Sequence, residues 1–156
     1  MDPQQRLFLE EAWHALEDAG YAGDGARGSS CGVYVGCAAG DYHYLFGEAP
    51  PPQAFWGNSG SVIPARIAYH LDLQGPAVAV DTACSSSLVA LHMACQGLRT
   101  REIEMAIAGG VFLQATPGFY ASANPAGMLS PTGQCHTFDK NADGFVPGEG
   151  VGAGIL

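Results

Sequence analysis

Hydrophobic positions at the start of the chain follow one face of a helix. Asp2 supplies an N-cap, Pro3 fits the first turn, and Gln5 stands at the third helical position, where a capping box places its glutamine. The apolar stripe that follows keeps helical spacing until Gly20. Its members are Phe8, Leu9, Ala12, Trp13, Leu16 and Ala19. The pattern predicts an amphipathic helix over residues 3–19.

The centre of the chain changes from a short apolar run to a longer segment with helical spacing. Residues 76–80, PAVAV, predict a strand buried on both faces. Residues 85–99 carry almost no charge and predict a helix buried on every side. Residues 105–113, MAIAGGVFL, predict a second buried strand, and Gly109-Gly110 within it indicates close backbone approach. Strand, helix and strand should form one unit with parallel strands and a right-handed crossover.

Shorter patterns predict the remaining elements. Residues 32–37 are rich in valine and predict a strand, and residues 151–156 predict another strand with a glycine-rich entry. Asn58, Ser59 and Ser61 offer caps for a helix that runs to Leu71, with Pro64 tolerated in its first turn. By composition, residues 22–31 form a loop, and irregular structure dominates residues 116–138.

Aromatic residues are concentrated between Gly40 and Gly57, around the proline run at 50–52. Such a segment could line the mouth of a substrate pocket. A surface loop folded over its own aromatic side chains is the more common arrangement, and we favour it here.

Length, composition and charge narrow the class of protein. The 156 residues are the size of one domain, and 47% hydrophobic with 13% charged residues provides material for a sizeable core. A net charge of −9, with 6 Lys and Arg residues that form no stripe, argues against nucleic-acid binding. The polar N-terminus and the lack of a long uncharged apolar run argue against a signal peptide and a membrane span. Five scattered cysteines without a CxxC pair fit a reducing compartment, so we expect a soluble, cytoplasmic protein.

Cys84 is the candidate catalytic residue. It stands where the central strand ends and the helix begins, and the first N–H groups of a helix lack internal acceptors and favour negative charge. A thiolate would be stabilised at this point, and the same N–H groups could hold the oxyanion that forms when a thioester is attacked. The other cysteines, Cys31, Cys37, Cys95 and Cys135, we expect to be buried and inert.

Other chemistries fit the sequence less well. His92 lies eight residues along the helix, roughly 12 Å from Cys84, and is too distant to act as its base. Residues 139–144 match the start of an EF-hand loop, but Gly150 replaces the bidentate glutamate, so no metal site is expected. The glycines at 148–154 match neither the GxGxxG nor the GxxxxGK[ST] pattern of nucleotide-binding loops. No GxSxG motif of a serine hydrolase is present.

The segment DTACSSSLVALH, from Asp81 to His92, resembles the active-site signature of the β-ketoacyl synthases, in particular the ketosynthase domains of modular polyketide synthases. Further blocks match in the family order. They are MDPQQRLFLEEAWHALEDAGY at 1–21, GVYVG at 32–36, ARIAYHLDLQGP at 65–76, AIAGGV at 106–111 and TFDKNADGFVPGEGVG at 137–152.

This resemblance implies a thiolase-like fold, a layered α/β/α arrangement, of which residues 1–156 would be the N-terminal half of one ketosynthase domain truncated at both ends. In the family, the cysteine matching Cys84 accepts an acyl chain as a thioester and then takes part in a decarboxylative Claisen condensation with a malonyl-type extender. Two histidines, one in an HGTGT-like motif, assist that step from the C-terminal half, and neither motif occurs here.

The resemblance also implies the partners. Substrates would arrive on the phosphopantetheine of an acyl carrier protein, and no cofactor would be bound directly. The complete domain would form a homodimer beside other megasynthase domains. Cysteine rather than glutamine at position 84 argues against the loading-module variant that only decarboxylates.

Two alternatives remain open at this point. The chain could be a non-catalytic fragment that acts at most as a module for carrier docking or dimerisation. It could also belong to a fatty-acid-type ketosynthase, although the DTACSSS and MDPQQR segments favour the polyketide enzymes.

Overall fold

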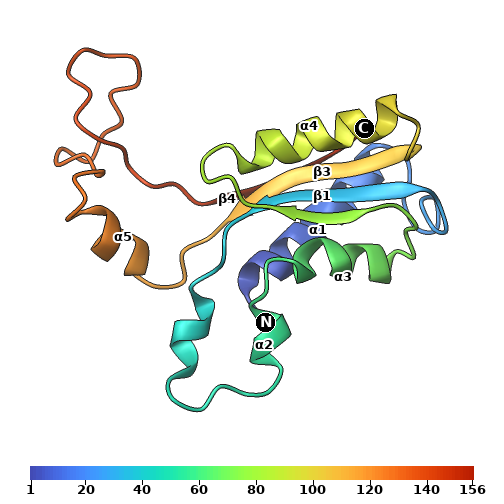
Figure 1. Ribbon diagram of the computed structural model, residues 1–156, viewed down its shortest axis with the longest axis horizontal. Helices are drawn as coiled ribbons and strands as arrows, with labels where there is room; N and C mark the ends of the chain where they lie inside the picture. The colour runs from blue at the N-terminus through green and yellow to red at the C-terminus, as the bar shows by residue number, and fades with distance from the viewer.

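The computed structural model describes residues 1–156 and is built on a four-stranded mixed sheet (Figure 1). The strands are β1 (Cys31–Cys37), β2 (Ala77–Val80), β3 (Met105–Phe112) and β4 (Gly150–Ile155), in the order β2-β1-β3-β4. The first three are parallel, and β4 runs antiparallel to β3. All four strands lie where the hydrophobic pattern predicts them, within a residue or two.

Helices cover both faces of this sheet. Helices α1 (Pro3–Asp18) and α3 (Val62–His70) pack on one face, and α4 (Ser86–Arg99) packs on the other (Figure 1). Because side chains alternate along a strand, Val33 and Val35 of β1 point into the core under α1 and α3, whereas Tyr34 joins the smaller core under α4. The predicted α/β/α layering is confirmed.

The start of α1 confirms part of the predicted cap. The Asp2 carboxylate accepts a hydrogen bond from the Gln4 N–H at 2.8 Å, and Pro3 occupies the first helical position. The expected capping-box role of Gln5 is wrong. Its amide is fully buried and donates instead to the Trp56 and Ser59 carbonyls at 2.9 and 3.2 Å.

Two predictions about burial are also wrong. β2 is not buried on both faces, because it is the edge strand, and Ala77 and Ala79 are exposed. Helix α4 is not buried on every side, since only Ser86, Ala90, Ala94 and Gly97 are buried. The sheet covers that face, and no other layer of this chain lies over the opposite face.

Three short elements lie outside the sheet and its helices. They are the 3₁₀ helix η1 (Tyr42–Phe46), α2 (Ala54–Gly57) and α5 (Gly118–Ala123). η1 and α2 lie in a lobe beyond one end of the sheet, and α5 begins an extended arm that returns to β4 (Figure 1). Irregular structure dominates residues 116–138, as predicted, and α5 is the one helix within them. The lobe contains aromatic contacts, such as Tyr42 with Phe46 at 5.4 Å, but Tyr44 and Phe55 remain exposed.

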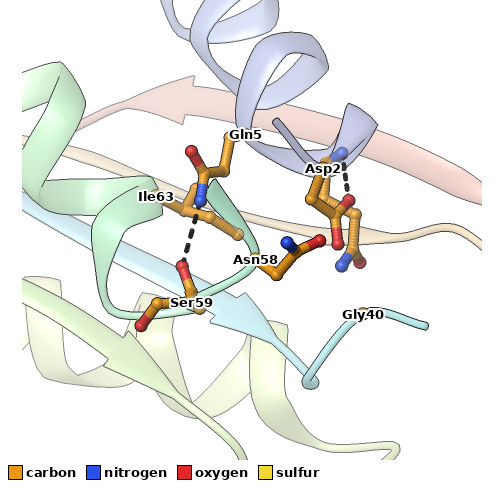
Figure 2. Close-up of a pocket in the computed structure, with 8 residues that line it drawn as sticks. Asp2, Gln5, Gly40, Asn58, Ser59 and Ile63 are labelled. Atoms are coloured by element: carbon orange, nitrogen blue, oxygen red, sulfur yellow. Dashed lines mark hydrogen bonds between the residues drawn. The ribbon is translucent and has the colours of Figure 1, made fainter. Parts of the chain in front are cut away.

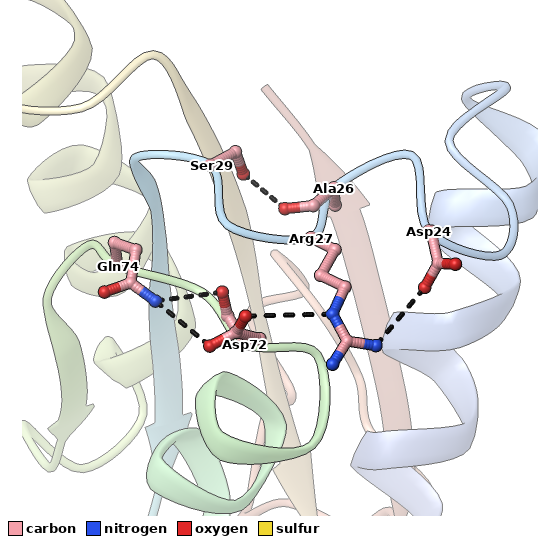
Figure 3. A network of polar contacts seen from close by, with 6 residues as sticks. All are labelled: Asp24, Ala26, Arg27, Ser29, Asp72 and Gln74. Atoms are coloured by element: carbon pink, nitrogen blue, oxygen red, sulfur yellow. Dashed lines mark hydrogen bonds and ion pairs between the residues drawn. The ribbon is translucent and has the colours of Figure 1, made fainter.

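The amino ends of β1 and β2 are held together by a polar network (Figure 3). Arg27 lies between Asp24 and Asp72, at 3.5 and 3.7 Å. The backbone adds hydrogen bonds from Gly28 N–H to the Asp72 carbonyl and from Gln74 N–H to the Ser29 carbonyl, both at 2.9 Å. The network joins the segments that precede β1 and β2, at the end of the sheet opposite Cys84.

None of the helices combines the length and the apolar character that a membrane span requires.

Candidate active site

Cys84 lies at the carboxyl end of β2, two residues before the first residue of α4. Its side chain is exposed. Ser85 is the N-cap residue of α4 but makes no side-chain capping bond. The predicted position of Cys84, between strand and helix, is confirmed.

The turn that carries Cys84 has a strained backbone. Ala83 has φ = 56°, a left-handed conformation that costs a residue with a side chain about 1–2 kcal/mol. The Asp81 carboxylate accepts a hydrogen bond from the Ala83 N–H at 3.1 Å. The Ser86 hydroxyl accepts from the Thr82 N–H at 2.9 Å and donates to the Ala83 carbonyl at 2.6 Å. These bonds hold the sharp change of direction between β2 and α4.

Two glycines allow α4 to begin directly against the sheet. Gly36 on β1 and Gly110 on β3 are register partners. A Cβ atom at Gly36 would lie 2.4 Å from the Ser87 nitrogen, and one at Gly110 would lie 2.8 Å from the Ser87 Cβ. Side chains at these positions would push the first turn of α4, and Cys84 with it, away from the sheet.

Loops at the same end of the sheet are joined by Asp41. Its carboxylate accepts hydrogen bonds from the N–H groups of Ala115 and Thr116, both at 2.8 Å, and from the Thr116 hydroxyl. Partial burial raises the pKa of Asp41, but the hydrogen bonds from Thr116 and Ala115 outweigh that effect, and the pKa lies below its usual value. Asp41 therefore connects the segment after β1 to the segment after β3 as a carboxylate.

The remaining cysteines differ from one another. Cys31 and Cys37 are buried, and burial raises the pKa of each thiol to about 11, with a smaller contribution from Asp81 and Asp2 at Cys37. The expectation of inert, buried thiols fits these two. It is wrong for Cys135, which is exposed and accepts a hydrogen bond from the Val146 N–H at 3.1 Å, and Cys95 is only half-buried.

No histidine of this chain hydrogen-bonds to Cys84. His92 is exposed on α4, eight residues after Cys84 in the sequence. His43 contacts the Gly40 carbonyl at 3.1 Å, and His136 lies 3.4 Å from the Thr132 hydroxyl.

A buried polar cluster supports the neighbouring loops (Figure 2). Asp2, Gln4 and Gln5 of the α1 start face Gly40, Asn58, Ser59, Gly60 and Ile63, and the space among them admits no water-sized molecule. The Asp2 N–H also donates to the Gly57 carbonyl at 2.6 Å. The cluster is packed structure that attaches the lobe containing α2 to α1, and not a ligand pocket.

Asp41 and Ser86 were not among the residues predicted from the sequence. Both carried a usable signal. Asp41 is an acidic residue that closely follows a buried parallel strand, at the end of the sheet where Cys84 was expected. Ser86 belongs to a residue type that hydrogen-bonds backbone groups at helix starts.

Comparisons with known proteins identify this arrangement. The family model described as beta-ketoacyl synthase, N-terminal domain, matches residues 1–156. Polyketide synthase PksM of Bacillus subtilis is 53% identical over 156 residues, which are all of this chain and 4% of PksM. One subunit of the phenolphthiocerol/phthiocerol polyketide synthase of Mycobacterium tuberculosis is 52% identical over 159 aligned residues, covering all of this chain and 8% of that protein.

Solved ketosynthases share the fold. The ketosynthase from module 6 of the bacillaene synthase of Bacillus subtilis superposes with a TM-score of 0.89 and 50% identity, covering 99% of this chain and 26% of that one. The oxazolomycin ketosynthase domain OzmH KS7 of Streptomyces albus gives a TM-score of 0.84 with 39% identity, covering 99% and 28%. The predicted thiolase-like α/β class is confirmed. With its whole length matched by the family model, the chain belongs to the β-ketoacyl synthase family, in which it corresponds to the N-terminal domain.

Proposed function

We propose that this chain is the nucleophile-bearing part of a polyketide β-ketoacyl synthase. One observation carries the proposal: the exposed thiol of Cys84 lies at a strained turn immediately before α4. The free N–H groups at a helix N-terminus suit the oxyanion that forms when a thioester is attacked. The relatives described above match the whole of this chain and are polyketide synthases, which favours polyketide over fatty-acid synthesis.

The first step is acyl transfer. The Cys84 thiolate attacks the carbonyl carbon of an acyl thioester, and the carbonyl becomes a tetrahedral oxyanion. The bond to the departing sulfur then breaks, so that the acyl group is left on Cys84 and the released thiolate takes up a proton. The acyl group would arrive as a thioester on the phosphopantetheine of an acyl carrier protein, as the family resemblance implies.

The second step is condensation. A malonyl-type thioester loses CO₂, its carbanion attacks the acyl carbonyl on Cys84, and the Cys84 thiolate leaves. The product is a β-ketoacyl thioester extended by two backbone carbons. The two histidines that assist this step in the family have no counterpart here, so we assign them to the remainder of the domain.

We further propose that residues 1–156 are part of one larger ketosynthase domain. The chain spans 26% and 28% of the two solved ketosynthase chains, and under a tenth of the polyketide synthases that it matches. By resemblance, the complete domain is a homodimer that works beside other megasynthase domains. Five free cysteines fit the reducing cytoplasm.

Acylation of the complete domain tests the proposal. The domain is incubated with an acyl-N-acetylcysteamine thioester, and its mass is measured intact. We expect the wild type to gain one acyl group and Cys84→Ala to gain none. Cys135→Ala, which removes the other exposed thiol, should be acylated like the wild type. A Cys84→Ala variant that still gains the acyl group would end the assignment.

A further inference from the structure

Three consecutive serines follow Cys84, and only one of them joins the two sides of the turn. Ser86 is 8% exposed and is one of the few buried polar side chains of the chain. Its hydroxyl accepts from the N–H of Thr82 and donates to the carbonyl of Ala83. A serine hydroxyl has one proton to donate, and here that proton is used within the turn.

The neighbouring serines make different contacts. The exposed Ser85 hydroxyl lies 2.9 Å from both the carbonyl oxygen and the hydroxyl of Thr82, and it makes no hydrogen bond to Ala83. The Ser87 hydroxyl makes no hydrogen bond, although its Cβ packs near Gly110. Ser86 is therefore the only one of the three whose side chain binds on both sides of the Ala83 Cα.

The hydrogen bonds of the Ser86 hydroxyl hold the backbone immediately before Cys84. Ala83 adopts its left-handed φ immediately before Cys84, and the Cys84 backbone takes its direction from that residue. The Ala83 carbonyl also accepts from the Ser86 N–H at 3.1 Å, so the hydroxyl adds a second bond to the same oxygen. The Thr82 N–H has the Ser86 hydroxyl as its acceptor. Loss of that hydroxyl would free the turn to relax and would move the Cys84 thiol relative to the start of α4.

We propose that Ser86 is a positioning residue for acyl transfer, which holds the Ala83 turn so that the Cys84 sulfur stays aligned at the N-terminus of α4. The inference rests on the proposed function, because it requires Cys84 to be the nucleophile. Ser86 exchanges no proton with the substrate. The sulfur–carbon bond forms at Cys84 as the carrier sulfur leaves, while the Ser86 hydroxyl remains bonded to Thr82 and Ala83.

The test compares Ser86→Ala with Ser87→Ala in the complete ketosynthase domain. Both variants delete one hydroxyl from adjacent positions, but only the first deletes hydrogen bonds. Single-turnover acylation by an acyl-N-acetylcysteamine thioester gives a maximal rate and a half-saturating concentration for each. Misplacement of a reacting atom by about 1 Å can cost about 100-fold. We expect Ser86→Ala to lower the maximal rate about 10- to 100-fold with a half-saturating concentration within about twofold of the wild type.

Ser86→Thr distinguishes the hydroxyl from the general packing of the site. It retains the oxygen and should recover most of the lost rate. If Ser86→Ala does not fold, the nearly isosteric Ser86→Cys is measured instead, and it should be slowed because a thiol is a weaker donor and acceptor.

Three results would overturn the inference. A folded Ser86→Ala that acylates at the rate of Ser87→Ala would show that the hydrogen bonds do not position the thiol. A Ser86→Thr variant as slow as Ser86→Ala would assign the effect to packing. A folded Ser86→Cys variant that acylates at the wild-type rate would likewise show that the Ser86 hydroxyl is not required. Failure of the wild type itself to become acylated at Cys84 would instead remove the proposed function.

Discussion

At the residue scale, burial separates the cysteines more sharply than sequence does. Cys31 is the first residue of β1 and Cys37 is the last, and both belong to the core under α1 and α3. Cys84 differs because it follows its strand and lies on the turn into α4. A thiol reacts as its thiolate, so both access to solvent and the raised pKa of the buried thiols matter.

Alkylation should reveal this difference. With a pKa of about 11, only about one in a thousand Cys31 or Cys37 thiols is ionised at pH 8. Burial further limits the access of a reagent to these thiols. We expect iodoacetamide at pH 8 to label Cys84 in the native protein and to leave these two unlabelled. Peptide mapping before and after denaturation in urea measures the difference. Labelling of Cys31 or Cys37 in the folded protein at a rate comparable to that of Cys84 would contradict the account.

Asp41 gives a prediction about pH. Its folded-state pKa is lowered, so its stabilisation is present above the unfolded value of about 3.9 and is lost as the pH falls through the folded pKa. Asp41→Asn should lower the free energy of unfolding by about 1–2 kcal/mol at pH 7, because an amide replaces a carboxylate that accepts three hydrogen bonds. Urea unfolding of wild type and variant at several pH values measures the difference.

The difference between wild type and Asp41→Asn should shrink below pH 4, where the wild-type carboxylate is increasingly protonated. Thr116→Val is the matched control, since it removes one of the three donors and should cost less than Asp41→Asn at pH 7. A loss that stays constant from pH 7 to pH 3 would show that the Asp41 charge is not what stabilises these loops.

At the element scale, the start of α4 depends on the glycines beneath it. Gly36→Ala should lower stability by about 1–3 kcal/mol, because the new Cβ would meet backbone atoms of Ser86 and Ser87, which cannot rotate away. It should also slow acylation, since Cys84 moves with the helix start. Gly60→Ala is the control, because its Cβ would make an ordinary 3.5 Å contact with the Cys37 sulfur. Equal thermal midpoints and acylation rates for the two variants would contradict the close fit of α4 on β1.

The helices and strands can be predicted from the local sequence, but which of their faces are buried and what they contact cannot. Valine-rich runs and helical spacing are sufficient for β1, α1 and α4, because propensity, caps and periodicity act over a few residues. The burial of α4 was predicted wrongly because an uncharged helix says nothing about what covers each face. Gln5 was misassigned for a related reason: its partners, Trp56 and Ser59, lie some 50 residues away in the sequence.

The candidate site shows the same limit. The position of Cys84 between strand and helix could be predicted from the sequence because the three are contiguous. The contact of Asp41 with Thr116 depends on β1 and β3 being adjacent in the sheet, which periodicity does not reveal. The strain at Ala83 is likewise a property of the folded turn, since alanine carries no sequence signal for a positive φ.

At the scale of the whole molecule, apolar side chains and a strand edge remain uncovered. Leu88 is 69% exposed and Leu91 is 39% exposed on the outer face of α4, and β2 has a free edge. Exposed apolar surface and unpaired strand edges both promote association between chains. The 156-residue chain studied alone should therefore self-associate and bind a hydrophobic dye.

Light scattering and dye fluorescence of the purified 156-residue chain measure this association. Leu88→Gln should reduce both signals, because it replaces one of the most exposed apolar side chains of α4. Leu45→Gln, at another exposed leucine in η1, is the matched control and should reduce them less. A monomeric chain that unfolds cooperatively and binds no dye would show that residues 1–156 fold stably on their own.

The most direct test of the central claim is to locate the acyl group on the complete ketosynthase domain. The acylated protein is digested at low pH to preserve the thioester, and tandem mass spectrometry assigns the added mass to a residue. We predict that it lies on Cys84, within the peptide that contains Asp81 to His92, and on no other cysteine. An acyl group found reproducibly on Cys135 or on a serine of this chain, with Cys84 unmodified, would contradict the assignment of the nucleophile.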